Sequence, residues 1–423
     1  MDSLRIRGGR ALRGSIRLSG AKNAALPALA AALLTDAEIV LRDVPRVRDV
    51  DTMLQVLEHL GASGGRDGSV VRLRFPSIRS DEAPYDLVRR MRASVLTLGP
   101  LLARHGRARV SRPGGCAIGA RPVDLHVDVM RAFGADVRLR EGYIEATAKR
   151  LRGAEYGFDV VTVTGTENAL MAATLASGTS LLRNCAREPE IVDLANLLVL
   201  MGARIEGAGT DTIQVEGVEA LRGAEHALMP DRIECGTFLV AAALAGDRVV
   251  IEGARPAHMA TVLDRFRRCG VPVEAGDDHL VVRRAEQLTH GDVVTRPYPG
   301  FPTDLQAQFM ALATQAAGVS VIRETIFENR FMHVPELARL GARIRVNGRS
   351  AFVEGPTPLS GAPLMATDLR ASACLVLAGL VAAGETCVRR IYHLDRGYDH
   401  IEEKLRSLGA DVERLSGPGG GSA

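Results

Sequence analysis

The chain has 423 residues, of which 46% are apolar and 24% charged, with 53 basic and 50 acidic side chains and no Trp. This composition is typical of a folded protein of two or three domains and excludes a disordered chain. The near-neutral charge and the 4% of aromatic residues argue against a nucleic-acid binder, which needs a basic face and stacking rings.

The N-terminal stretch MDSLRIRGGRALRG lacks the apolar core of a signal peptide. The longest apolar runs, 24–34 and 373–383, are too short for a membrane span of about 20 residues. The six cysteines are scattered and form no CxxC pair. We therefore expect free thiols, no zinc site and a reducing cytoplasm rather than a secreted or membrane protein.

An apolar residue, Gly and a small or apolar residue recur six times along the chain. The glycines are 68 to 73 residues apart, at Gly61, Gly134, Gly202, Gly270, Gly341 and Gly409. Each unit begins with a polar turn and a capping residue, followed by a helix that is apolar almost all round and should be buried. A β-branched strand follows, and then an amphipathic helix that ends at the Gly. One or two further strands complete the unit. The expected caps are Asn23, Asp86, Asn168, Asp231, Asp304 and Asp368.

In the first unit, this order gives a buried helix over 24–34, a strand over 38–41 and an amphipathic helix over 49–60. The pattern predicts six βαβαββ repeats in an α/β protein of two lobes, with helices inside and sheets outside. We expect a hinge over 223–230, a substrate site between the lobes, and a disordered tail over 417–423.

Several basic residues are candidate anion ligands. Lys22, one of only three lysines, stands at a helix start, where the helix dipole disfavours a cation unless an anion binds there too. The alternative is a solvated surface lysine. Arginines near unit starts and ends could clamp carboxylate or phosphate, although each alone fits an ordinary surface role. They are Arg92, Arg121, Arg330, Arg370 and Arg396.

A loop rich in Gly and Pro interrupts the second unit over 111–124 and carries Cys116 at its tip. Arg112 and Arg121 flank this thiol and would lower its pKa, which makes Cys116 a candidate acid or nucleophile. An ordinary buried cysteine remains the alternative. Asp304 and Asp368 are candidate acids or bases, but each falls where every repeat has a capping residue, so spacing cannot single out Asp304. No metal-binding His spacing and no phosphate-loop motif occur.

Nine motifs, in order along the chain, resemble the enolpyruvyl transferases of bacterial peptidoglycan synthesis over about residues 1–415. The motifs are LSGAKNAALPALAAALL, PYDLVRRMRASVLTLGP, RPGGCAIGARPVDLH, AREPEIVDLAN, PDRIECGTFLVAAA, FPTDLQAQF, FENRFMHVPEL, TDLRASA and IYHLDRGY. The resemblance implies two inside-out α/β barrels, one built from 1–20 with 230–423 and the other from 21–229. The shikimate-pathway branch of this class is not expected to have the PGGC loop.

The resemblance also implies the reaction. The 3-hydroxyl of UDP-N-acetylglucosamine adds to phosphoenolpyruvate, a tetrahedral intermediate forms, and phosphate leaves, without a metal or organic cofactor. Cys116 would donate the proton and Asp304 would act as the base, while Lys22, Arg121 and Arg396 would neutralise phosphate or carboxylate charge. Asn23, Arg92, Arg330, Asp368 and Arg370 would complete the clamp. The nucleotide would bind to Arg121, Pro122, Val123, Asp124, Leu125 and the backbone near Ile326.

One departure from the family pattern concerns the nucleotide. Some family members have a Lys where this chain has Val160, so that contact is either made by backbone or shifted to Thr162 or Thr164. Two alternatives to the main reading are a transferase acting on another acceptor, such as shikimate 3-phosphate, and a repeat-built binding scaffold without activity. The presence of Cys116, Lys22, Asp304 and Arg396 argues against the scaffold.

Overall fold

The computed structural model describes residues 2–88, 91–112 and 123–416. These residues divide into two compact units. We call the unit made of 20–112 and 123–229 the N-terminal unit, and the unit made of 2–19 and 230–416 the C-terminal unit. Cys116, Arg121, Pro122 and the tail 417–423 lie outside the described residues.

The N-terminal unit contains three four-stranded sheets, in the orders β14-β3-β5-β4, β6-β7-β9-β8 and β10-β11-β13-β12. The strands are β3 (Ile39–Arg42), β4 (Ser63–Asp67), β5 (Val70–Arg74), β6 (Glu82–Ala83), β7 (Arg107–Ser111), β8 (Asp136–Arg140), β9 (Tyr143–Thr147), β10 (Glu155–Gly157), β11 (Thr179–Arg183), β12 (Arg204–Glu206), β13 (Thr212–Glu216) and β14 (Ala224–Ala227). The helices are α1 (Lys22–Ala31), η1 (Ala32–Leu34), α2 (Arg48–Leu60), α3 (Tyr85–Val88), η2 (Arg92–Thr97), α4 (Leu98–His105), α5 (Asp124–Ala132), α6 (Val163–Ala173) and α7 (Pro189–Leu200).

The C-terminal unit has the same design, with sheets β16-β17-β15-β2, β18-β19-β21-β20 and β22-β23-β1-β24. The strands are β1 (Ser3–Arg7), β2 (Leu12–Arg17), β15 (Gly246–Glu252), β16 (Val273–Ala275), β17 (His279–Val282), β18 (Val293–Val294), β19 (Gly318–Arg323), β20 (Arg343–Asn347), β21 (Ser350–Gly355), β22 (Pro363–Met365), β23 (Glu385–Arg389) and β24 (Asp411–Leu415). The helices are α8 (Arg232–Ala245), η3 (Pro256–Met259), α9 (Ala260–Arg268), η4 (Thr303–Leu305), α10 (Gln306–Ala313), α11 (Val334–Arg339), α12 (Leu369–Gly379), η5 (Ile391–Arg396) and α13 (Ile401–Ser407).

All six sheets share one pairing scheme, which confirms the predicted βαβαββ repeat. In the second repeat, β6 is parallel to β7, β7 is antiparallel to β9, and β9 is antiparallel to β8. Two sheets take their first strand from a distant part of the chain, because β2 runs parallel to β15 and β14 runs parallel to β3. The segment 223–230, expected as a hinge, contains the paired strand β14 and ends at the division between the two units, so the hinge stays a prediction.

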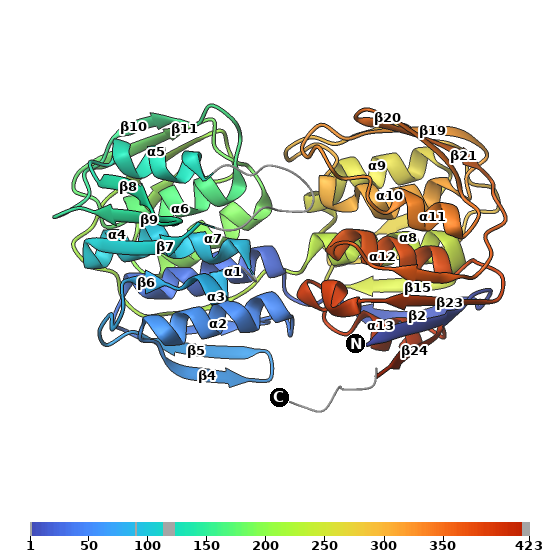
Figure 1. Cartoon of the computed structure of the whole chain (residues 1–423), viewed down its shortest axis with the longest axis horizontal. Helices are drawn as coiled ribbons and strands as arrows, with labels where there is room; N and C mark the ends of the chain where they lie inside the picture. Colours follow the sequence, from blue (N-terminus) through green and yellow to red (C-terminus); the bar gives the residue numbers. More distant parts are fainter. Residues whose placement is uncertain (1, 89–90, 113–122, 417–423) are drawn as a thin grey trace. The chain divides into compact units, whose positions relative to one another are not determined.

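The apolar helices form the interior of each unit, and the sheets lie outside them (Figure 1). In the C-terminal unit, α8, α10 and α12 pack against one another, and all eight residues of α10 are buried. Such helices need no polar face because sheets surround them. The six repeat glycines all adopt a positive φ, between 85° and 119°, so each ends its helix in the left-handed conformation that Gly tolerates best.

Two further expectations concern the cysteines and membrane segments. The five cysteines in the described ranges are free thiols. Among helices of the described chain, none is long and apolar enough to cross a membrane.

Candidate functional site

Asp304 and two arginines form the central charged cluster of the C-terminal unit. Arg330 Nη2 donates to Asp304 Oδ1 at 2.8 Å, and Arg370 Nη2 donates to Asp304 Oδ2 at 2.9 Å. The two guanidinium side chains are only 5% and 4% exposed, whereas the carboxylate is 28% exposed. Three candidate residues thus form one cluster, in which two arginines bind a carboxylate that solvent can still reach.

Arg370 is fixed at both its backbone and its side chain. Asp368 Oδ1 accepts from the backbone N–H groups of Arg370 and Ala371, at 2.9 and 3.1 Å, and so caps α12. The Nε and Nη1 atoms of Arg370 are buried and have no hydrogen-bond partner in the described part of the chain. Burial lowers the pKa of Arg370, but the charge of Asp304 more than offsets this effect, so the pKa of Arg370 is raised overall. The cluster therefore holds a permanent cation beside the Asp304 carboxylate.

Polar groups from α8 and α10 surround this cation. The Tyr398 ring lies 5.4 Å from the guanidinium carbon of Arg370, and its hydroxyl is 2.8 Å from Thr237 Oγ1 and 3.1 Å from Gln308 Nε2. Asp231, which caps α8 through the N–H groups of Ile233 and Glu234, also acts on the charge of Arg370. The N-terminal ends of the buried helices thus meet at this cluster, where their dipoles favour an anion.

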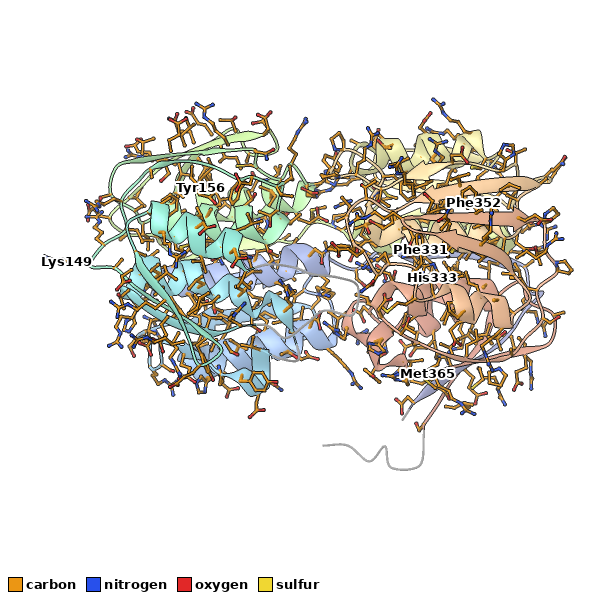
Figure 2. The ribbon with its side chains drawn as sticks, turned by 45° about the horizontal axis from the view of Figure 1, so that its top comes forward. Lys149, Tyr156, Phe331, His333, Phe352 and Met365 are labelled. Carbon is orange, nitrogen blue, oxygen red and sulfur yellow. The ribbon has the colours of Figure 1, made fainter. Side chains whose placement is uncertain are left out.

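His333 lies beside Phe331, with ring centres 6.5 Å apart (Figure 2). Its Nε2 is 3.2 Å from Met310 Sδ, and the residue is 1% exposed. Burial lowers the pKa of His333 to about 4, with Asp368 raising it and Arg330 lowering it. The imidazole is therefore neutral near pH 7 and packs the segment that carries Arg330.

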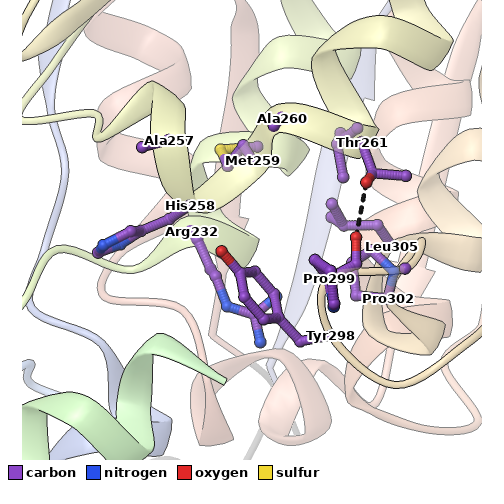
Figure 3. A pocket seen from close by; sticks show the side chains of 12 residues that line it. Arg232, Ala257, His258, Met259, Ala260, Thr261, Tyr298, Pro299, Pro302 and Leu305 are labelled. Atoms are coloured by element: carbon purple, nitrogen blue, oxygen red, sulfur yellow. Dashed lines mark hydrogen bonds between the residues drawn. The ribbon is translucent and has the colours of Figure 1, made fainter. Parts of the chain in front are cut away.

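A small pocket opens beside Pro302 and Leu305, close to Asp304 in sequence (Figure 3). Arg232 lies over the Tyr298 ring at 5.6 Å, and Thr261 Oγ1 donates to the Pro299 carbonyl at 2.6 Å. Its volume of about 90 Å³ is well below the roughly 300–1,000 Å³ of ligand pockets. This pocket is too small to be the site for a sugar nucleotide.

Arg396 and Ile326, two other candidates, also lie in the C-terminal unit. Arg396 is the last residue of η5 and is half-buried, and the neighbouring Asp395 is bound by Arg414 of β24. The backbone N–H of Ile326 donates to Glu324 Oε1 at 2.8 Å. A ligand could therefore use this N–H only by competing with the Glu324 carboxylate.

Lys22 begins α1 in the N-terminal unit and pairs with Asp49 of α2, with 2.5 Å between Nζ and Oδ2. The Lys22 side chain is 11% exposed and that of Asp49 is 5% exposed. The alternative of a solvated surface lysine was therefore wrong. Asp49 was not among the predicted residues, although it stands with Asp51 in the first turn of α2, where acidic residues are common.

The remaining described candidates lie at element starts in the N-terminal unit. Arg92 is the first residue of η2, Asp124 is the first residue of α5, and Val123 and Leu125 flank Asp124. Val160 is 64% exposed and offers no charge.

The predicted capping role holds for only some of the repeat positions. Asp231 and Asp368 cap their helices through their side chains. Asn23 does not cap α1, whose N-cap is Ala21, and Asn168 lies inside α6, whose N-cap is Thr162. The N-cap position of η4 is Pro302, so Asp304 is not a cap either. At Asn168 and Asp304, hydrogen bonds to other segments take the place of the local capping role.

Comparisons with known proteins agree over the whole chain. The family model described as EPSP synthase (3-phosphoshikimate 1-carboxyvinyltransferase) matches residues 6–405. Relatives from Myxococcus xanthus and Koribacter versatilis, both named UDP-N-acetylglucosamine 1-carboxyvinyltransferase, are 56% and 54% identical and align over 98% of this chain and 99% and 97% of their own length.

Two solved structures are also similar. The enolpyruvyl transferase NikO from Streptomyces tendae has a TM-score of 0.90 at 31% identity, with 99% of each chain covered. An EPSP synthase from Acinetobacter baumannii has a TM-score of 0.76 at 17% identity, covering 98% of this chain and 100% of its own, which shows a shared fold.

Proposed function

Because this chain belongs to the EPSP synthase family of enolpyruvyl transferases, we propose that it transfers the enolpyruvyl group of phosphoenolpyruvate to the 3-hydroxyl of UDP-N-acetylglucosamine. Phosphate is released, and the product enters peptidoglycan synthesis as its first committed intermediate. The observation that supports this acceptor is the full-length identity of 54–57% to relatives that carry that enzyme name.

The Asp304 cluster supports a role in activating the acceptor hydroxyl. Asp304 accepts the proton of the 3-hydroxyl as the oxygen attacks C2 of phosphoenolpyruvate. Each carboxylate oxygen accepts a hydrogen bond from one arginine, which fixes the orientation of the carboxylate. The fixed positive charge of Arg370 favours a phosphate or carboxylate group nearby, whose charge is greatest in the tetrahedral intermediate.

Lys22, Asn23 and Arg396 bind the anionic groups of phosphoenolpyruvate in this proposal, with Arg92 and Asp368 completing the clamp. Asp49 holds Lys22 in place when no substrate is bound, and the bound anion then shares the lysine with Asp49. Lys22 therefore stays oriented throughout the cycle.

Cys116 delivers the proton to the methylene carbon, and Arg121 lowers the pKa of its thiol. Four of the other five cysteines differ from Cys116 because they are buried. Burial raises the pKa of the Cys185 thiol to about 12 and raises the pKa of Cys235, Cys269 and Cys374 as well. A thiol-directed epoxide should label Cys116 selectively, and more readily with UDP-N-acetylglucosamine bound. We also infer a cytoplasmic location, supported by the free thiols.

The nucleotide binds along 121–125 and near Ile326, and no metal or organic cofactor takes part. Metal-free catalysis here rests on fixed cations and a thiol rather than on a bound Lewis acid.

Phosphate release from phosphoenolpyruvate tests the proposal, with either UDP-N-acetylglucosamine or shikimate 3-phosphate as the acceptor. We expect release only with the sugar nucleotide. Release with shikimate 3-phosphate alone would replace the acceptor, and release with neither would support a binding scaffold. Cys116→Ser should lower turnover by at least about 100-fold, the range of general acid catalysis. Cys387→Ser, at a half-buried thiol on β23, is the matched control.

A further inference from the structure

One guanidinium of the C-terminal unit, that of Arg414 on β24, is surrounded by three carboxylates. Arg414 donates from Nη2 to Asp395 Oδ1 at 2.5 Å and from Nη1 to Asp395 Oδ2 at 3.3 Å. Its Nε donates to Glu402 Oε1 at 2.7 Å, and its Nη1 also lies 3.4 Å from Asp2 Oδ2. The side chains of Arg414, Asp395 and Glu402 are 27%, 16% and 3% exposed. Every nitrogen of this guanidinium thus donates to a carboxylate, and the two nearest carboxylates are largely buried.

Arg414 joins the two ends of the turn between η5 and α13. Asp395 is the last residue but one of η5, and Glu402 stands in the first turn of α13. The turn between them carries Arg396, a candidate ligand of phosphoenolpyruvate, and Tyr398, whose ring lies 5.4 Å from a guanidinium carbon of the central charged cluster. Because one side chain binds both ends, neither end of the turn can shift without breaking an ion pair of Arg414.

The negative charge of Asp395 stands next to Arg396 in the chain. An unpaired carboxylate at this place would repel an anionic substrate and would itself attract the Arg396 guanidinium. Asp395 also stands at the C-terminal end of η5, where backbone carbonyls disfavour a negative charge. The two hydrogen bonds from Arg414 offset that charge. Burial lowers the pKa of Arg414, but its bonds to Asp395 and Glu402 raise the pKa overall, so the guanidinium stays charged.

We propose that Arg414 is a positioning residue for phosphoenolpyruvate binding, which holds η5 against α13 and neutralises Asp395, so that Asp395 does not compete with the substrate for Arg396. The inference rests on the proposed function, because it requires Arg396 to bind an anionic group of phosphoenolpyruvate. Arg414 itself touches no substrate and acts through Asp395 and Glu402. A purely structural ion pair would stabilise the unit without favouring one substrate over the other, so the two substrates distinguish these roles.

Phosphate release, measured with each substrate varied in turn, tests the role of Arg414. Arg414→Gln removes the positive charge and leaves Asp395 without this partner. The KM for phosphoenolpyruvate should rise about tenfold, the size expected when a charge near an anion loses its counter-charge. The KM for UDP-N-acetylglucosamine and the kcat should change less than about threefold. Arg414→Lys keeps the positive charge, so its KM for phosphoenolpyruvate should stay within about threefold of the wild-type value.

A double variant separates the effect of the charge from a loss of stability. Asp395→Asn combined with Arg414→Gln leaves no carboxylate at this end of η5, so the KM for phosphoenolpyruvate should return to within about threefold of the wild-type value. Its Tm should fall about as far as that of Arg414→Gln, because both variants lose the same ion pairs. Arg5→Gln is the matched control, since it breaks an ion pair with Glu413 between β1 and β24. This control should leave both KM values unchanged.

The outcomes separate this inference from the proposed function. If the wild type is active and Arg414→Gln has an unchanged KM for phosphoenolpyruvate, the inference is wrong and the function stands. Equal rises in both KM values would show a merely structural role and would also overturn it. A double variant as impaired as Arg414→Gln would refute the neutralisation of Asp395. If the wild type releases no phosphate with UDP-N-acetylglucosamine, the proposed acceptor fails and the inference fails with it.

Discussion

Replacing Asp304 by Asn removes the negative charge that two buried arginines share, while nearly preserving the shape of the side chain. The amide oxygen can still accept from one guanidinium. The amide nitrogen faces an N–H donor of the other guanidinium, from which it cannot accept a hydrogen bond. Hydrogen bonds to charged groups contribute about 1.5–3 kcal/mol each, and breaking a buried ion pair costs about 3–5 kcal/mol. Because the carboxylate is 28% exposed, water offsets part of this loss.

We therefore expect Asp304→Asn to lower the free energy of unfolding by about 2–4 kcal/mol. For a folding unit of this size, such a loss corresponds to a fall in Tm of about 5–12 °C. Scanning calorimetry without substrate measures the change. Phosphate release should fall by about 100- to 10,000-fold if Asp304 is the base.

Glu234→Gln provides the matched control for this variant. Glu234 is a buried carboxylate of the same unit that binds Lys404 Nζ at 2.6 Å and the Ser19 N–H at 2.7 Å. The Glu234→Gln variant should lose about as much stability as Asp304→Asn and retain most of the wild-type kcat. An Asp304→Asn enzyme whose kcat is within tenfold of the wild type would refute the assignment of the base. A Tm within 1–2 °C would refute the account of the ion pairs.

Three further predictions concern stability. Because the pKa values of His126 and His333 are lowered to about 4, the unfolded chain binds more protons than the folded one between pH 6.5 and 4, and acidification destabilises the protein. From pH 7 to pH 5, each imidazole should lower the free energy of unfolding by about 2 kcal/mol. In urea titrations, His333→Gln should therefore lose about 2 kcal/mol less than the wild type over this pH range. Equal losses in both proteins would contradict this reasoning. Asp231→Ala removes two N-cap hydrogen bonds and should cost about 1–2 kcal/mol by thermal unfolding. Gly20→Ala would place a Cβ only 1.8 Å from the Asp43 carbonyl oxygen, so it should fold poorly or lose more than about 2 kcal/mol; a Tm equal to that of the wild type would show that the backbone yields easily.

The repeat was readable from the sequence because its signals are local. Each of the six glycines ends an amphipathic helix at a positive φ, and the helices between them are apolar on nearly every face. The exchange of strands between distant parts of the chain carries no such signal. Nothing near Ser3–Arg7 shows that β1 pairs with β23 and β24, which lie almost a whole chain length away.

The candidate site was only partly readable for a similar reason. Asp304 stands at the same place in its repeat as Asp231 and Asp368, which are helix caps, and only its arginine partners distinguish it. Asp49 was missed, and Asn168 was expected only as a cap, because their partners come from other helices. The helix α6 also carries Thr164, Thr166 and Glu167, so its sequence did not distinguish Asn168. The roles assigned to Cys116, Lys22 and Arg396 stay predictions.

The placement of β1 and β2 in the C-terminal unit has a consequence for biosynthesis. These strands leave the ribosome first, yet their partners β15, β23 and β24 are translated only after the whole N-terminal unit. The N-terminal unit can close its three sheets as soon as β14 has emerged, since β14 pairs with β3. In the C-terminal unit, β2 stays unpaired until β15 is made, just past the middle of the chain, and β1 stays unpaired until β23 and β24 are made near its end. Unpaired strand edges are aggregation-prone. A nascent chain stalled after residue 230 should therefore contain one finished unit together with two unpaired strands, β1 and β2, that are exposed to chaperones.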